Sequence, residues 1–260
     1  MTSNPPSDSG RNRIQAVDNA FEIILALREK EWTGVSELAN ELELPKSTVH
    51  VYLSTLHDIG FLTKKEGKYR LSLRFLELGG NIRQQIDIFR TARHQIDELS
   101  NRTGEVANLG VEENGWRVLL YSAEPPEGLF DNAPTGEFKP MHWTALGKAL
   151  LAQCSDERIE EIVEREGLPA ATDHTITDPN RLFEEIERIR ERGYSIEDEE
   201  HHESIKAIGV PVKHVSDPPL RTAVSISGPK SRIGEGDKVE DLLQEIQSTV
   251  NVIELEYEYY

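Results

Sequence analysis

Residues 14–71 carry three short helical patterns followed by a hairpin pattern, and this order limits the possible folds more than any other feature of the sequence. Apolar residues at helical spacing predict a first amphipathic helix over about 14–29. Its expected apolar stripe consists of Ile14, Val17, Phe21, Ile24 and Leu25. A second, short helix is predicted after Gly34 and a third from Pro45, because proline is tolerated in a first helical turn. Gly60 is suited to end the third helix.

A basic hairpin is predicted directly after the third helix. Phe61-Leu62-Thr63 and Tyr69-Arg70-Leu71 flank the segment Lys-Lys-Glu-Gly-Lys, in which the glycine favours a turn. Three helices followed by a hairpin form the layout of a winged helix-turn-helix domain. In that domain the third helix enters the major groove of DNA and the hairpin, or wing, lies on the DNA backbone.

The third helix has one apolar face and one polar face. Val49, Leu53 and Leu56 form its predicted buried stripe. Short hydroxyl side chains and lysines on the opposite face and on the wing can reach phosphates and base edges. The residues expected to contact DNA are Lys46, Ser47, Thr48, His50, Val51, Ser54, Lys64, Lys65, Lys68 and Arg70.

The charge distribution separates this basic region from an acidic remainder. The chain of 260 residues has a net charge of −18, which by itself would argue against a nucleic-acid partner. Residues 11–83, however, carry a net charge of +1, and residues 44–74 within them carry +4. Residues 84–260 carry −18. The alternatives to DNA binding are a small helical domain with an ordinary solvated surface and a winged helix that contacts only proteins.

The rest of the chain predicts an α+β domain. A long helix is expected over 74–102, and two strands are joined by Asn114-Gly115, a strong hairpin signal. The later strands and helices do not alternate as they do in a parallel sheet. The predicted organisation is a disordered tail over 1–10, a winged helix-turn-helix over 11–73, a linker helix over 74–102, and an effector-binding domain over 103–260.

Several classes of protein are disfavoured by the sequence. No apolar run of about 18 residues predicts a membrane helix, no signal peptide is evident, and a cytoplasmic location is the default. No catalytic motif is visible, so the chain is predicted not to be an enzyme, and no cofactor is expected. Cys154 is expected to be a small buried residue rather than a redox sensor. His201-His202-Glu203 is interpreted as a surface segment rather than a metal site, and Trp116 and Trp143 as core or interface residues.

Six segments of the chain carry motifs that recur together in one protein family. Four of them lie in the predicted DNA-binding region: Ile14–Phe21, Val35–Ala39, Leu44–His50 and Leu56–Leu62. The other two are Thr144-Ala145-Leu146-Gly147-Lys148-Ala149-Leu150-Leu151-Ala152 and Ser225-Ile226-Ser227-Gly228-Pro229. Together these segments resemble the IclR family of transcriptional regulators. The resemblance covers about residues 14–257. Val51 departs from the pattern, because the family usually has arginine there; valine can touch a thymine methyl group but cannot contact guanine or phosphate.

The resemblance implies a GAF-like antiparallel sheet with a ligand pocket in the C-terminal part. The residues themselves agree in one respect: Ala223, Ser225 and Ser227 share one face of a predicted strand, opposite an apolar face. By resemblance, the effector-binding residues are Ala145, Gly147, Glu197 or Asp198, Ala207, Ser225 and Ser227. The family further implies homodimers that often pair into tetramers, and effectors such as organic acids, sugars or sugar acids.

The sequence therefore predicts an effector-responsive regulator that binds double-stranded DNA at a palindromic operator. The runner-up is a bifunctional enzyme with an appended winged helix. The acidic excess on residues 84–260 exceeds what solubility requires, and lysine is scarce relative to acidic residues. Such a surface is typical of proteins adapted to molar salt, so a halophilic archaeon is the expected source.

Overall fold

The structure is a computed structural model that describes residues 14–125, 133–213 and 220–259. The tail predicted over 1–10 lies outside these residues. The chain divides into two compact units, one that ends at Gln85 and one that begins at Ile86. Each unit has its own hydrophobic core, and each is described here by itself.

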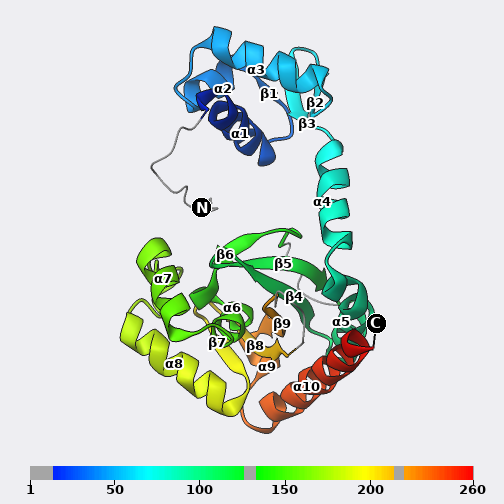
Figure 1. The fold of residues 1–260 in the computed structure, drawn as a ribbon, viewed down its shortest axis with the longest axis vertical. Helices are drawn as coiled ribbons and strands as arrows, with labels where there is room; N and C mark the ends of the chain where they lie inside the picture. The colour runs from blue at the N-terminus through cyan, green and yellow to red at the C-terminus, as the bar shows by residue number, and fades with distance from the viewer. Residues whose placement is uncertain (1–13, 126–132, 214–219, 260) are drawn as a thin grey trace. The chain divides into compact units, whose positions relative to one another are not determined.

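The N-terminal unit combines four helices with a small antiparallel sheet (Figure 1). Its elements are α1 (Gln15–Arg28), β1 (Thr33–Gly34), α2 (Val35–Glu41), α3 (Lys46–Asp58), β2 (Leu62–Lys65), β3 (Lys68–Leu71) and α4 (Arg74–Gln84). The strand order is β1-β3-β2. The three predicted helices and the hairpin are confirmed, whereas β1 was not predicted.

The hairpin turn of this unit follows from two residues with positive φ. Glu66 and Gly67 have φ values of 51° and 78°, as a two-residue turn between twisted antiparallel strands requires. Tyr69 on β3 is only 1% exposed, so the wing is anchored to the core through its inner face. The lysines beside the turn consequently lie on the outer part of the wing.

The buried face of α1 differs from the predicted stripe. Asn19, Ile23 and Leu27 are its buried residues, whereas Ile14, Val17 and Phe21 are 69%, 50% and 57% exposed. Apolar residues surround most of this helix, so their spacing alone does not select the face that packs against α3. The predicted stripe of α3 is confirmed, since Val49, Leu53 and Leu56 are all buried.

The sequence predicts one helix over 74–102, and the chain instead forms two. α4 ends at Gln84, Ile86 adopts an extended conformation with φ −87° and ψ 105°, and α5 (Asp87–Thr103) then begins. Helical periodicity continues across the break, which is why the sequence does not reveal it. Ile86, Ile88 and Phe89 pack into the core of the C-terminal unit, whereas α4 has no buried residue.

The C-terminal unit is built on a six-stranded antiparallel sheet in the order β6-β5-β4-β9-β8-β7. The strands are β4 (Val106–Glu113), β5 (Trp116–Ala123), β6 (Phe138–Pro140), β7 (Ser195–Asp198), β8 (Ile205–Val212) and β9 (Thr222–Pro229). The remaining elements are the 3-10 helix η1 (Met141–Trp143), α6 (Ala145–Leu151), α7 (Asp156–Glu166), α8 (Pro179–Arg192), α9 (Lys230–Ile233) and α10 (Asp237–Glu258). The α+β class with an antiparallel sheet is confirmed, although β6, η1 and α9 were not predicted.

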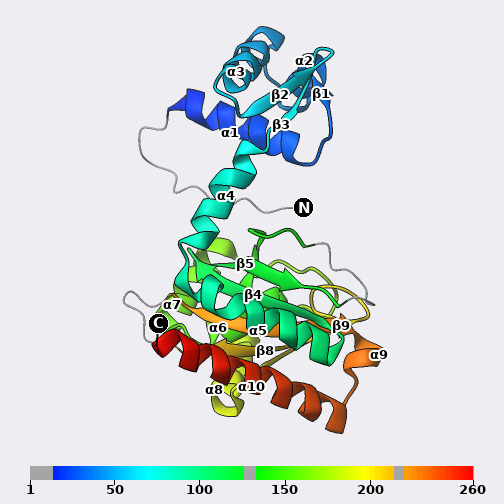
Figure 2. The same ribbon diagram turned by 90° about the vertical axis from the view of Figure 1, so that its right-hand side faces the viewer.

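Helices cover both faces of this sheet (Figure 2). α5 and α10 pack on one face, where alternate strand residues such as Val224 and Ile226 form the larger core cluster. α6, α7 and α8 form a second cluster on the other face, with Leu119 and Ala223. The strands have more polar residues on this second face, and the cavity described below lies there.

Candidate functional site

The outer face of α3 presents the residues that the sequence predicts as DNA contacts. Lys46, Ser47, His50 and Val51 are exposed, and Thr48 and Ser54 are half-buried. Val51 is 62% exposed, because Val49, Leu53 and Leu56 already fill the inner face of the helix. The helix therefore offers short polar groups and one apolar group to a partner.

The wing presents a cluster of exposed cations. Lys64, Lys65, Lys68 and Arg70 all lie on β2 and β3 with exposed side chains. The Arg70 guanidinium stacks 4.8 Å from the Trp32 ring centroid, which holds it against the sheet. Across the described part of the chain, no ion pair neutralises Lys46 or the three wing lysines, so their charges remain available to phosphates.

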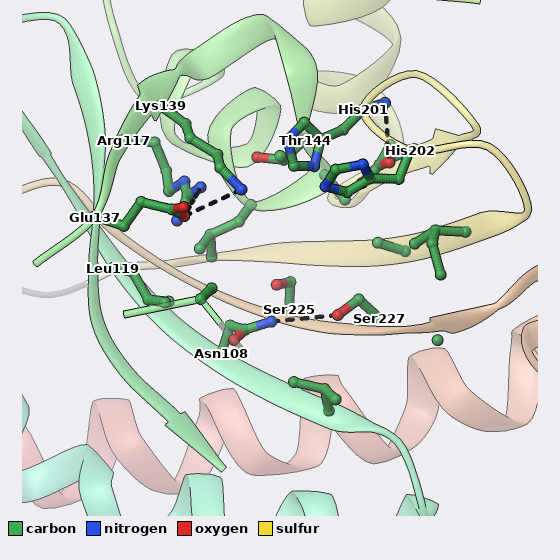
Figure 3. Close-up of a pocket in the computed structure, with 18 of the residues that line it drawn as sticks. Asn108, Arg117, Leu119, Glu137, Lys139, Thr144, His201, His202, Ser225 and Ser227 are labelled. Atoms are coloured by element: carbon green, nitrogen blue, oxygen red, sulfur yellow. Dashed lines mark hydrogen bonds and ion pairs between the residues drawn. The ribbon is translucent and has the colours of Figure 1, made fainter. Parts of the chain in front are cut away.

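A cavity of about 270 Å³ lies in the C-terminal unit, between α6 and the sheet (Figure 3). Five residues predicted to bind the effector line it: Ala145, Glu197, Ala207, Ser225 and Ser227. These residues lie on four elements, and the first and last of them are 82 positions apart in the sequence. Antiparallel pairing of β7, β8 and β9 brings the strand residues together. Because strand side chains alternate, Ser225 and Ser227 face the cavity while Val224 and Ile226 face the core.

Two predicted residues lie outside the cavity lining. Gly147 packs against η1, where a Cβ atom would lie 2.1 Å from the carbonyl oxygen of Met141, and its N–H donates to the Thr144 hydroxyl at 3.0 Å. Asp198 follows Glu197 on β7 and therefore points to the opposite face. Its carboxylate forms ion pairs with Lys230 at 2.7 Å and Lys206 at 3.6 Å. The sequence left the choice between Glu197 and Asp198 open, and in the structure Glu197 is the one that lines the cavity.

Glu197 lies on β7, and its buried carboxyl group reaches the start of α6. Its side chain accepts the backbone N–H groups of His201, at 3.3 Å, and of Ala145. Desolvation by burial raises the pKa of Glu197 to about 7. The charge of Lys148 lowers this pKa and the charge of Glu200 raises it, and these two side chains form a buried ion pair with each other.

Sequence reasoning missed a charged group on the cavity wall formed by β5 and the segment leading into β6. Arg117 and Lys139 both form ion pairs with Glu137, at 3.2 Å and 3.1 Å. Arg117 is 4% exposed and shares the cavity-facing side of β5 with Leu119. That single arginine inside the run Trp-Arg-Val-Leu-Leu was the available signal, because a buried charge within a strand requires a partner.

Asn108 and His201 also line the cavity and were not predicted to do so. The expected surface position of His201 is wrong. Its ring stacks on Trp143 with centroids 5.5 Å apart, and burial together with the positive charge of Lys139 lowers its pKa. Neighbouring His202 also reaches the cavity although its side chain is exposed. Among the described residues, no cluster of His, Cys, Asp and Glu could hold a metal ion.

Cys154 and Trp116 are both buried, at 4% exposed each, as the sequence predicts. Burial raises the pKa of the Cys154 thiol to about 11, which disfavours the reactive thiolate. Neither residue lines the cavity. Within the described ranges, no helix is long and apolar enough to cross a membrane.

Comparisons with known proteins match both the DNA-binding region and the domain that holds the cavity. The family profile described as "Bacterial transcriptional regulator IclR C-terminal" matches residues 81–255, and the "IclR helix-turn-helix domain" profile matches residues 16–66. The probable HTH-type transcriptional regulator ArcR of Halobacterium salinarum is 30% identical over 95% of both chains. The HTH-type transcriptional regulator KdgR of Dickeya chrysanthemi is 32% identical over 90% of this chain and 77% of its own length.

Solved structures agree in fold over nearly the whole chain. The crystal structure of the Thermotoga maritima IclR protein matches with a TM-score of 0.77 and 26% identity, covering 94% of this chain and 98% of that one. An IclR homologue from Microbacterium hydrocarbonoxydans, solved with 4-hydroxybenzoate, matches with a TM-score of 0.80 and 22% identity over 94% of this chain and 100% of that one. The chain therefore belongs to the IclR family of transcriptional regulators, with an N-terminal helix-turn-helix domain and a C-terminal effector-binding domain.

Proposed function

We propose that this regulator binds DNA through α3 and the wing and that a small molecule in the C-terminal cavity controls this binding. The observation that carries the proposal is the presence, in one chain, of an unneutralised basic surface and a separate polar cavity. Lys46, Ser47 and Thr48 position α3, and His50, Val51 and Ser54 face the base edges. Phosphates are contacted by the wing residues Lys64, Lys65, Lys68 and Arg70.

The proposed assembly is a homodimer, or a pair of dimers, on a palindromic operator. A single winged helix buries too little DNA surface for tight specific binding, so two copies are expected. Exposed apolar residues in the N-terminal unit supply candidate contacts between copies. They are Ile14, Val17 and Phe21 on or beside α1 and Leu73, Leu76 and Ile82 on or beside α4.

The proposed effector is a small organic acid, sugar or sugar acid of carbon catabolism. One relative, 28% identical, is described as the acetate operon repressor of Salmonella typhimurium. The similar structure from Microbacterium hydrocarbonoxydans holds 4-hydroxybenzoate. In this chain, Ala145, Glu197, Ala207, Ser225 and Ser227 are proposed to contact the effector, because all five line the cavity.

Regulation without catalysis is the proposed activity, because the relatives described above are regulators. This proposal sets aside the alternative of an enzyme with an appended winged helix. The proposed location is the cytoplasm, where a DNA-binding regulator meets its operator. A halophilic archaeon is the proposed source, supported by the net charge of −18 and by the similarity to a regulator from Halobacterium salinarum.

Two variants test whether the N-terminal unit binds DNA and the C-terminal cavity binds the effector. The operator is first selected from genomic DNA with the full-length protein, and binding is measured by fluorescence anisotropy. Lys64→Ala is expected to weaken binding to all sequences similarly, whereas Lys213→Ala, which removes an exposed lysine of the C-terminal unit, is the matched control. Ser225→Ala combined with Ser227→Ala is expected to abolish the ligand response and leave DNA binding intact. Loss of DNA binding with the ligand response retained would reverse the assignment.

A further inference from the structure

The C-terminal end of α3 presents two backbone carbonyl groups just beyond its capping motif. That motif is a Schellman motif, in which the N–H of Gly60 donates to the carbonyl oxygen of His57 at 2.9 Å. Its second hydrogen bond runs from the N–H of Phe61 to the carbonyl oxygen of Leu56 at 2.8 Å. Gly60 has a φ of 84°, the left-handed conformation that this motif requires. The carbonyl groups of Ile59 and Gly60 take no part in the motif and need donors from elsewhere.

Both carbonyl groups accept hydrogen bonds from the residues that start α4, which follows β3 directly in the chain (Figure 1). The Ser72 hydroxyl donates to the carbonyl oxygen of Gly60 at 2.7 Å. The Arg74 guanidinium donates to the carbonyl oxygen of Ile59 at 2.7 Å. The Ser72 hydroxyl also accepts the N–H of Arg74 at 3.3 Å, so one side chain joins the end of α3 to the first turn of α4.

Aromatic contacts reinforce this α3–α4 junction. The rings of Phe61 and Phe75 meet edge to face with centroids 5.1 Å apart, and the Arg74 guanidinium lies 5.0 Å from the Phe61 ring centroid. By contrast, α4 has no buried residue. Buried packing therefore does not fix the direction in which α4 leaves the winged helix, and the contacts of Ser72, Arg74 and Phe75 do.

The apolar residues next to this junction are among those proposed to contact a second copy. Leu73 and Leu76 are 82% and 71% exposed, and they flank Arg74 and Phe75 in the sequence. In a dimer held through this surface, the α3–α4 junction fixes each α3 relative to the contact between the copies. One base pair added between two half-sites separates them by about 3.4 Å more and rotates one relative to the other by about 35°. A rigid junction therefore favours a single half-site spacing.

We propose that Ser72 and Arg74 are positioning residues that set the half-site spacing recognised by the dimer. This inference rests on the proposed dimer on a palindromic operator and adds the residues that determine its spacing. Neither residue has to touch DNA in this role, because each acts on α3 through a backbone carbonyl group.

The test measures binding to operators that differ only in spacing. The operator is selected from genomic DNA with the full-length protein, and base pairs are then inserted or deleted one at a time between its half-sites. Fluorescence anisotropy gives the affinity at each spacing and for a single half-site. The wild type is expected to lose about tenfold or more in affinity for a change of one base pair, because one half-site is then displaced and rotated.

The double variant Ser72→Ala and Arg74→Met is expected to reduce this loss to about threefold or less, since fewer contacts then fix the direction of α4. Its affinity for a single half-site should stay within about twofold of the wild type, because α3 and the wing keep their own residues. Loss of the Arg74 charge affects every spacing alike, so the ratio of affinities between spacings separates position from charge.

Arg90→Met is the matched control, because it removes an exposed arginine of α5 and should keep the wild-type dependence on spacing. Arg74 is itself exposed, so Arg74→Met alone provides the test where the double variant fails to fold.

Three results would overturn the inference and leave the proposed function standing. The first is the same dependence on spacing in the double variant as in the wild type. The second is a loss of single half-site affinity in the double variant as large as its loss on the full operator, which would show that these residues serve only the fold of α3. The third is a wild-type protein that binds all spacings equally. A selected operator without two-fold symmetry, or a wild-type protein that binds it as a monomer, would instead contradict the proposed assembly and the inference with it.

Discussion

Glu197 is a cavity residue whose carboxyl pKa lies near neutral pH in the folded protein. Burial raises its pKa from 4.5 to about 7. A carboxyl group with a raised pKa in the folded state stabilises the fold fully below its unfolded pKa, and this contribution is lost as pH rises through the folded pKa. We therefore expect the melting temperature to fall between about pH 4.5 and pH 7 through this group.

The variant Glu197→Gln isolates that contribution. Lowered pKa values of His142 and His201 act in the opposite direction, because their protonation is disfavoured in the fold and stability falls at low pH. Both proteins contain these histidines, so the difference in melting temperature between the wild type and Glu197→Gln cancels their contributions. Glu160→Gln, at an exposed position of α7, is the control. A difference in melting temperature that stays constant across this pH range would show that Glu197 does not titrate there.

Val51 is expected to read a thymine methyl group in the major groove. An exposed valine cannot donate or accept a hydrogen bond, and the hydroxyl of neighbouring Thr55 donates to the Val51 carbonyl oxygen at 2.9 Å. Burying one methyl group is worth about 0.8 kcal/mol, or about fourfold in affinity. Replacing thymine by uracil at one operator position should therefore weaken binding of the wild type about fourfold.

The matched comparison for this prediction is Val51→Ala, which should bind the thymine and uracil operators equally. His50→Ala should change sequence preference at a neighbouring position, since imidazole can hydrogen-bond to base edges. Uracil substitution that leaves wild-type affinity unchanged at every operator position would exclude a role for Val51 in base recognition.

At the scale of helices and strands, local chemistry decided which elements the sequence could predict. α7 and α8 begin at residues that a sequence can reveal, because the Ser155 and Asp178 side chains accept N–H groups of the first helical turn. β1 and β6 are too short to have their own pattern and exist through pairing with β3 and β5. The Arg117–Glu137–Lys139 group depends on that same pairing, so the sequence alone could not assemble it.

The faces of α1 and α4 that remain exposed lead to a prediction about assembly. Phe21 and Leu76 are 57% and 71% exposed, so a second copy would bury apolar surface that water now contacts. Phe21→Glu or Leu76→Glu should convert the dimer to a monomer in light scattering and weaken operator binding. Leu255→Glu, at a 56% exposed position of α10, should keep the dimer. A wild-type protein that is monomeric at micromolar concentration would refute this arrangement.

At the scale of the whole molecule, the charge is divided between the two functions. The DNA-binding region is close to neutral with a basic surface, whereas residues 84–260 carry a net charge of −18. Repulsion of this size destabilises a compact state unless ions screen it. Screening increases with salt, since the Debye length falls from about 10 Å at 0.1 M to about 3 Å at 1 M. The same screening weakens phosphate contacts and therefore favours recognition through base edges and apolar contacts.

We therefore expect the melting temperature to rise as KCl increases from about 0.1 M to about 2 M, and specific DNA binding to persist above about 1 M. The first effect follows from screened repulsion, and the second requires contacts, such as that of Val51, that do not depend on counterion release. Thermal melts and fluorescence anisotropy across this range measure both, with a scrambled DNA sequence as the control for non-specific binding. A melting temperature that stays flat or falls with KCl, or specific binding that is lost by about 0.5 M, would show that the acidic surface is not an adaptation to salt.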